Sequence, residues 1–174
     1  MRLHRLAAIL FLFSCFALPG AAQQTFGDTT VCFTPGQPCA GLIAEAIRGA
    51  RSEVLVQAFG FSYATVIEAL SDAHGRGVAV TALLDRTVQK EPSPRALTMV
   101  KQGVRAYIDD RVAIAHNKVM VIDGATVITG SFNFTQSAQS RNAENLLVIR
   151  NPQLASAYRD NFRSRLAGAT EWKP

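Results

Sequence analysis

Four residues in the second half of the chain carry an imidazole, an ammonium, a hydroxyl and a carboxamide at close spacing. They are His116, Lys118, Ser131 and Asn133, and they interrupt segments otherwise rich in Val, Met, Ile and Phe. One nucleophile or base among several hydrogen-bond donors suits an oxyanion. A phosphoryl group is therefore the expected ligand of these side chains.

No metal ion or other cofactor is expected at these residues. Asp109 and Asp110 are paired carboxylates, but the side chains of adjacent residues diverge. The segment also lacks the second metal-binding histidine of an HNH nuclease. Taken singly, His116 or Lys118 could be an ordinary strand residue, so it is their combined spacing that indicates a site.

A β-hairpin is expected to bring the four polar side chains together. Two β-rich segments flank Asp123-Gly124, a dipeptide that favours a two-residue loop. Such a loop pairs Ile122 with Ala125 and, counted back, sets Lys118 opposite Thr129. All four polar side chains would then share one face, whereas a three-residue loop would break this parity.

The rest of the chain alternates between patterns typical of strands and of helices. Strands are expected at 53–59, 78–84, 104–108, 115–122, 126–132 and 145–149. Helices are expected around 43–50, 66–73, 93–103 and 152–166. Ser93-Pro94 and Asn151-Pro152 are typical helix starts. In a chain of 174 residues, this alternation predicts a single α/β domain with a mixed β-sheet flanked by helices.

The N-terminal segment is typical of a secretory signal peptide. Arg2 and Arg5 precede an uncharged apolar run that ends in small residues, so residues 1–22 are predicted to be cleaved, leaving the domain 23–174. A lipoprotein with a lipidated Cys15 is the alternative. Because the run is too short to span a membrane, we expect an exported protein, periplasmic or secreted, without stable membrane insertion.

Two cysteines of the predicted domain flank a Pro-Gly turn. In an oxidising compartment, Cys32 and Cys39 are expected to form a structural disulfide. A metal site is the competing interpretation, but no second pair of Cys or His residues completes it.

The polar segment resembles the HKD motif of the phospholipase D superfamily. The motif residues are His116, Lys118, Asp123, Gly130, Ser131, Asn133 and Glu144. The likeness runs from about Phe33 to Trp172 and is similar to the short, single-motif bacterial periplasmic endonucleases of the Nuc type. The resemblance implies a mixed sheet between helices, an active site at a homodimer interface, and phosphodiester hydrolysis without a metal.

The resemblance also implies a role for each catalytic residue. His116 would attack phosphorus and form a covalent phosphohistidine, aimed by Glu144. Lys118 and Asn133 would bind the non-bridging oxygens of the phosphate. Ser131 would act as a supporting hydrogen-bond donor.

Two further residues are candidates near the motif. Asp123 is the acid of the motif, but the predicted hairpin sets it at the turn and away from His116, so a structural or supporting role is expected. Arg111, just before the catalytic strand, is a candidate contact for the substrate backbone.

Cleavage also needs a group that protonates the leaving oxygen, and in the family this group is the histidine of a second motif. This chain has one such motif, so the acid must come from elsewhere. His4 lies in the predicted signal peptide, and His74 stands at a helix end with no Lys two residues on. A two-fold axis would bring His116 of two copies to one phosphate. Imidazole changes protonation near neutral pH, so one ring can attack while the other donates a proton.

The predicted homodimer needs an apolar surface. On the face that the predicted hairpin gives to the site, the apolar residues are Met120, Ile122 and Val127. They would be costly to expose, and a second copy would cover them.

The substrate is open at this point. The net charge of +5 permits contact with phosphates without predicting nucleic-acid binding. We expect a sequence-nonspecific endonuclease that acts on DNA, with RNA as a further substrate. Candidate backbone contacts are Arg86, Lys90, Arg95, Arg111, Arg141 and Arg150. A phospholipase D that acts on lipid headgroups and an inactive module that binds phosphate or nucleic acid are the alternatives.

Overall fold

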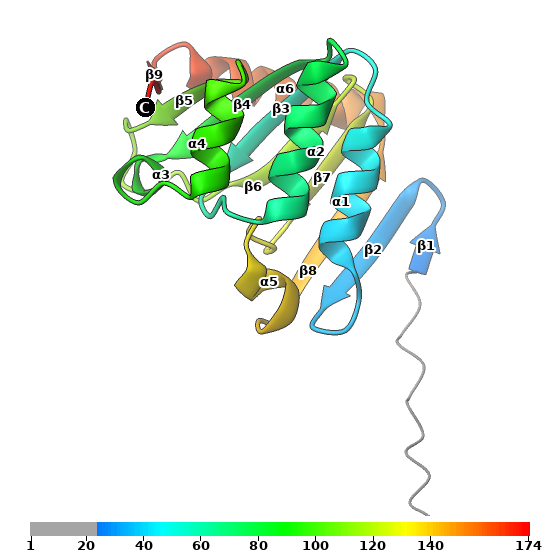
Figure 1. The fold of residues 1–174 in the computed structure, drawn as a ribbon. Coiled ribbons are helices and arrows are strands. Elements are labelled where there is room, and N and C mark those ends of the chain that lie inside the picture. Colours follow the sequence, from blue (N-terminus) through cyan, green and yellow to red (C-terminus); the bar gives the residue numbers. More distant parts are fainter. Residues whose placement is uncertain (1–23) are drawn as a thin grey trace, which may run out of the picture.

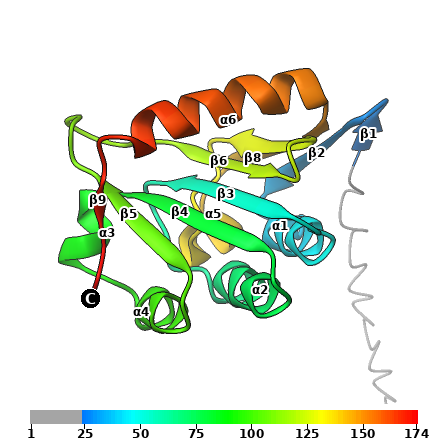
Figure 2. The same ribbon diagram turned by 90° about the horizontal axis from the view of Figure 1, so that it is seen from above.

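The computed structural model describes residues 24–174 as a layered α/β domain. The predicted signal peptide at 1–22 and Cys15 therefore lie outside the described residues. Nine strands form one sheet in the order β1-β2-β8-β7-β6-β3-β4-β5-β9. Helices α1, α2 and α4 cover one face and α6 lies on the other (Figures 1 and 2).

The strands are β1 (Gln24–Phe26), β2 (Thr29–Thr34), β3 (Glu53–Ala58), β4 (Ala79–Asp85), β5 (Arg105–Asp109), β6 (Lys118–Ile122), β7 (Thr126–Gly130), β8 (Glu144–Arg150) and β9 (Thr170–Glu171). The helices are α1 (Cys39–Arg48), α2 (Ala64–Gly75), α3 (Arg86–Lys90), α4 (Pro94–Lys101), α5 (Gln136–Ser140) and α6 (Pro152–Leu166). Strand β4 runs parallel to β3 and β5, and the other pairs are antiparallel. The predicted mixed sheet flanked by helices is confirmed.

The predicted helix starts are confirmed by their capping bonds. The Ser93 hydroxyl accepts a hydrogen bond from the backbone N–H of Ala96, and Pro94 follows as the first residue of α4. The Asn151 carboxamide caps α6 in the same way through the N–H of Leu154. These bonds satisfy N–H groups that a helix leaves without an internal partner, and so they fix where α4 and α6 begin.

Helices of the same chain cover both faces of the sheet. The prediction that Met120, Ile122 and Val127 form a dimer surface is therefore wrong. Met120 and Ile122 belong to the core under α1, α2 and α4. Val127 belongs to the second core, under α6. All three are at most 5% exposed, so they leave no apolar surface for a second copy to cover.

The β6–β7 hairpin has a different register from the predicted one. Asp123 and Gly124 form the expected tight turn, with φ of 52° and 61° and a hydrogen bond from Ala125 N–H to the Ile122 carbonyl. However, Ile122 pairs with Thr126, so Ala125 is an extra residue in the hairpin. The predicted pairing of Ile122 with Ala125 is wrong, and the shared face of the four polar residues cannot rest on it.

A disulfide joins Cys32 of β2 to Cys39 at the start of α1, as predicted. Strand β2 itself is missing from the sequence-based expectation, as are β1 and β9. Residues 115–117 lie outside any strand because β6 begins at Lys118. Within residues 24–174, no helix has the length and apolar character needed to cross a membrane.

Candidate active site

The predicted catalytic residues converge on one end of the sheet, next to α5 (Figure 1). Lys118 begins β6, which pairs with the end of β3, and Glu144 begins β8. Ser131 and Asn133 follow the end of β7, and His116 precedes β6. The carboxyl ends of the parallel strands β3, β4 and β5 meet at the same edge, where open α/β sheets bind ligands.

Lys118 carries a buried ammonium group. The residue is 7% exposed, its Nζ donates a 2.9 Å hydrogen bond to the His116 carbonyl, and it lies 5.1 Å from the centroid of the Phe59 ring. Burial lowers the pKa of Lys118, and the charges of Glu144 and Asp85 act in the opposite direction. A cation held in this way can bind an anionic oxygen more strongly than a solvated lysine would.

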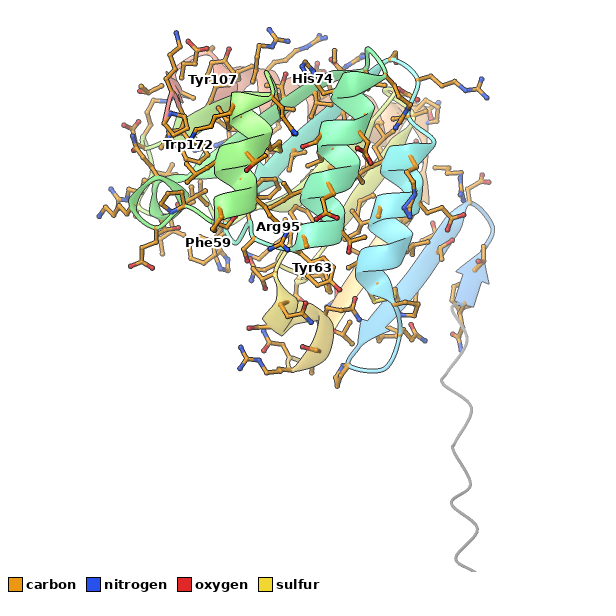
Figure 3. All side chains as sticks on the ribbon, in the orientation of Figure 1. Phe59, Tyr63, His74, Arg95, Tyr107 and Trp172 are labelled. Atoms are coloured by element: carbon orange, nitrogen blue, oxygen red, sulfur yellow. A yellow bond between two sulfur atoms is a disulfide. The ribbon has the colours of Figure 1, made fainter. Side chains whose placement is uncertain are left out.

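His116 presents its imidazole at the surface. The residue is exposed, and its ring packs against Phe59 with 4.7 Å between the ring centroids. The next residue is fixed by a hydrogen bond from Phe59 N–H to the Asn117 carbonyl. Figure 3 labels Phe59 at this end of the molecule and His74 at the other, so His74 takes no part in the site.

Ser131 and Glu144 form a hydrogen-bonded pair. The Ser131 hydroxyl donates a 2.5 Å bond to Glu144 Oε2, and Asn142 Nδ2 donates to Oε1 at 3.0 Å. The backbone N–H of Asn145 donates to the Ser131 oxygen. Within residues 24–174 Glu144 has no hydrogen bond to His116, so the proposed aiming of the imidazole by Glu144 stays a prediction.

Gly130 lets the chain leave β7 toward the site. Its φ of 151° is unfavourable for other residues, and a Cβ at this position would lie 2.2 Å from the Asn145 carbonyl oxygen. The chain therefore turns here against the start of β8. This turn, rather than the hairpin register, brings Ser131 beside Glu144.

Asn133 is held by a segment that the sequence reasoning missed. Its Oδ1 accepts a 3.2 Å hydrogen bond from Gly60 N–H, which leaves the amide nitrogen to donate to a ligand. A Cβ on Gly60 would lie 3.2 Å from the Asn133 Cβ and 2.9 Å from Thr135 Cγ2. The signal in the sequence was Gly60, directly after the predicted strand 53–59, because glycine there permits close approach of the backbone.

Arg111 is engaged away from the catalytic residues. Its guanidinium donates hydrogen bonds to the carbonyls of Ser164 and Arg165 at the C-terminal end of α6. A cation at this place satisfies free carbonyls and complements the helix dipole. The predicted contact of Arg111 with substrate gains no support from this position.

The other candidate phosphate contacts are scattered. Arg86 donates to the carbonyl of Ala113, close to the site. Arg95 forms an exposed ion pair with Glu68, and Arg141 bonds to Ser137. No group of three or more His, Cys, Asp or Glu side chains within residues 24–174 is arranged to hold a metal ion.

Asp123 lies at the far end of β6. It follows Lys118 by five residues, which is about 17 Å at the rise of a strand. Its carboxylate accepts hydrogen bonds from the backbone N–H groups of Arg51, Ser52 and Glu53 and from the Ser52 hydroxyl. The structure thus separates Asp123 from the cluster of predicted catalytic residues and makes it an anchor for the start of β3.

We expect Asp123→Asn to lower the free energy of unfolding by about 2 kcal/mol, because hydrogen bonds to an ionised carboxylate are lost. Asparagine tolerates the left-handed backbone at this position, which limits the change to the side chain. Urea unfolding measures this loss, and activity per folded molecule should stay at the wild-type level. Equal stability of the two proteins would contradict the anchor role.

The pH dependence of this loss has a definite sign. Burial alone would raise the pKa of Asp123, but the hydrogen bonds from Glu53, Ser52 and Arg51 outweigh it and hold the pKa below its ordinary value. The stabilisation is present above the pKa of the unfolded chain and is lost as the pH falls through the lowered pKa. The difference between the wild type and Asp123→Asn should therefore shrink in acid.

Comparisons with known proteins agree with this geometry. Residues 43–166 match the family described as "Cardiolipin synthase, PLD-like domain". The chain is 42% identical to a phospholipase D of Rickettsia bellii, over 84% of this chain and 73% of that protein. It is 31% identical to a mitochondrial cardiolipin hydrolase of Xenopus laevis, over 66% of this chain and 54% of that protein.

A solved structure shares the whole architecture. The crystal structure of Nuc, a phospholipase D family member from Salmonella typhimurium, superposes with a TM-score of 0.76 and 29% sequence identity. The superposition covers 84% of this chain and 98% of Nuc. Almost all of that protein thus corresponds to the domain described above.

Proposed function

The chain belongs to the phospholipase D-like family and is a phosphodiester hydrolase, and we propose that its substrate is nucleic acid. In this proposal it is a sequence-nonspecific endonuclease that hydrolyses DNA, and RNA as well. Support comes from its likeness to Nuc over nearly the full length of that protein. Like the Nuc-type endonucleases that the motif resembles, residues 24–174 form one domain with one HKD motif.

The observation that carries the proposal is an exposed imidazole beside a buried ammonium group. His116 is open to a large substrate, and Lys118 lies behind it at 7% exposure. Such an arrangement can accept a phosphodiester in the middle of a polymer, because the exposed imidazole can be reached without the end of a strand. Backbone phosphates carry no base identity, which fits cleavage without sequence preference.

The proposed reaction has two steps. An imidazole nitrogen of His116 attacks phosphorus, the P–O bond to the leaving strand breaks, and a protonated histidine of a second copy gives its proton to the leaving oxygen. Water then attacks phosphorus, the P–N bond to His116 breaks, and the second histidine takes up a proton from that water. Lys118 and the amide nitrogen of Asn133 neutralise the charge on the non-bridging oxygens.

The second copy would also cover exposed apolar side chains beside the site. Ile114, two residues before His116, is 57% exposed, and Phe33 is 51% exposed. Phe33 pairs with Asn145 across β2 and β8, and the Asn145 side chain lies 3.4 Å from the Ser131 hydroxyl. Large exposed apolar groups near a polar site favour a protein partner there. We propose that these residues, in place of Met120, Ile122 and Val127, form the interface.

Mixed dimers test the shared site. A dimer of one wild-type copy and one His116→Ala copy lacks either the nucleophile or the acid, so we expect less than about a tenth of the wild-type rate. Two different affinity tags allow the mixed dimer to be purified, and the wild-type dimer with the same tags is the control. Retention of half the wild-type rate would show that each copy works alone and would contradict the shared site.

Hydrolysis of lipid headgroups is the second candidate function. The names of the relatives, phospholipase D and mitochondrial cardiolipin hydrolase, favour it. The deciding experiment offers the purified protein plasmid DNA, an RNA oligonucleotide, and vesicles of phosphatidylcholine or cardiolipin, with His116→Ala subtracted from each. We expect the polynucleotides to be cut; headgroup release without polynucleotide cleavage would overturn the nuclease proposal, as would binding without turnover.

We also propose that the protein is exported, to the periplasm or the medium. The predicted signal peptide and the Cys32–Cys39 disulfide support this location, since disulfides persist in oxidising compartments.

A further inference from the structure

Asp85 is a buried carboxylate next to the site that the mechanism above does not use. It is the last residue of β4 and is only 2% exposed. One oxygen accepts a 2.9 Å hydrogen bond from Thr87 N–H and so caps α3. The other accepts a 2.7 Å bond from the backbone N–H of Ala115, thirty residues away in the chain and one residue before His116.

The segment that carries His116 depends on such anchors. Residues 110–117 contain no helix or strand, so no ladder of backbone bonds fixes them. Asp85 holds the residue before His116, and Phe59 N–H holds the residue after it through the Asn117 carbonyl. Arg86, the first residue of α3, donates a 2.7 Å hydrogen bond to the Ala113 carbonyl. Asp85 and Arg86 therefore hold the segment at two points.

We propose that Asp85 is a positioning residue for phosphodiester hydrolysis, which fixes the backbone beside His116 through its hydrogen bond to Ala115. The inference rests on the proposed function of His116. Asp85 touches neither the substrate nor the reacting atoms, and acts through the position of His116.

Asp85 also contributes to the electrostatics at Lys118. The groups that face its ammonium are the His116 carbonyl, the Phe59 ring and the carboxylates of Glu144 and Asp85. Burial lowers the pKa of Lys118, while Glu144 and then Asp85 raise it. Loss of the Asp85 charge should therefore lower the pKa of Lys118 further.

Asp85 itself is held in its ionised form. Burial would raise the pKa of Asp85, but the hydrogen bonds from the backbone of Thr87 and Ala115, together with the charge of Arg86, hold it below the ordinary value. These contacts thus favour the charged form of the Asp85 carboxylate.

Two substitutions separate this role from simple folding. Asp85→Asn is nearly isosteric, removes the charge and turns an amide NH2 group toward one of the two N–H donors. Asp85→Ser keeps a good N-cap for α3, but is too short to reach Ala115. The matched control is Asn151→Ala, which removes the cap of α6 and contacts none of the catalytic residues.

The assay uses bis(4-nitrophenyl) phosphate and plasmid DNA, with thermal unfolding measured in parallel. We expect both Asp85 variants to lower kcat by about 10- to 100-fold, the scale of a misplaced reacting group, with KM changed less than twofold. Asn151→Ala should lower the unfolding temperature but leave kcat unchanged.

Two results would overturn the inference. One is a wild-type kcat in folded Asp85→Ser. The other is a loss of activity that follows the unfolding temperature equally in the Asp85 and Asn151 variants. If the wild type hydrolyses the small phosphodiester and leaves DNA intact, the nuclease proposal fails, while the small substrate still measures the effect of Asp85.

Discussion

Replacement of His116 by alanine is expected to lower kcat for DNA cleavage by about 10⁴-fold or more, the scale seen when a catalytic nucleophile is removed. The imidazole is exposed and packs only beside Phe59. The free energy of unfolding should therefore change by no more than about 0.5 kcal/mol. Single-turnover cleavage of a labelled oligonucleotide, with urea unfolding of the same samples, measures both quantities.

The matched control for this prediction is His74→Ala. His74 is the other histidine within residues 24–174, and it lies at the opposite end of the molecule (Figure 3). Its replacement should leave the cleavage rate unchanged. Activity of His116→Ala within tenfold of the wild type would remove the nucleophile from the proposed mechanism.

Replacement of Lys118 by methionine is expected to separate activity from stability. The loss of one preorganised cation at the phosphate should lower kcat/KM by about 10²- to 10³-fold. Methionine fills a similar volume without a buried charge, so the fold should be as stable as the wild type or more stable. Steady-state cleavage and thermal unfolding test the two parts. The control is Lys101→Met, an exposed residue at the end of α4, which should change neither.

The stability of the wild type and that of Lys118→Met should depend differently on pH. Burial lowers the pKa of Lys118 below the ordinary lysine value of 10.5. The unfolded chain therefore binds more protons, and wild-type stability should rise as the pH rises between the two pKa values. In Lys118→Met this rise should be absent, whereas an unchanged profile would mean that Lys118 is effectively solvated.

The fold could be predicted to a large extent because its signals are local. Alternating and helical periodicities, with caps at Ser93 and Asn151, indicated the strands and helices that build the two cores. Strand β2 was missed because it surrounds Cys32 in a segment that looked like a disulfide-bearing turn. Strand β9 has only two residues and exists through its pairing with β5, which no local pattern shows.

The candidate site could be predicted as a set of residues but not as a geometry. The extra residue Ala125 shifts the hairpin register by one, so the face shared by the four polar residues could not be counted from the turn. Gly130 and Gly60 shape the site through close backbone approaches, and the sequence does not show which distant residues they meet. The role of Asp85 could not be predicted either, because its hydrogen bond with Ala115 joins residues thirty positions apart.

In the function proposed above, this chain cuts polynucleotides with a histidine and without a metal ion. The most direct test is plasmid cleavage by the protein without residues 1–22 in excess EDTA, with His116→Ala beside it. The proposed mechanism predicts that cleavage continues in EDTA and disappears in the variant. Cleavage that stops in EDTA and returns with added metal would contradict it.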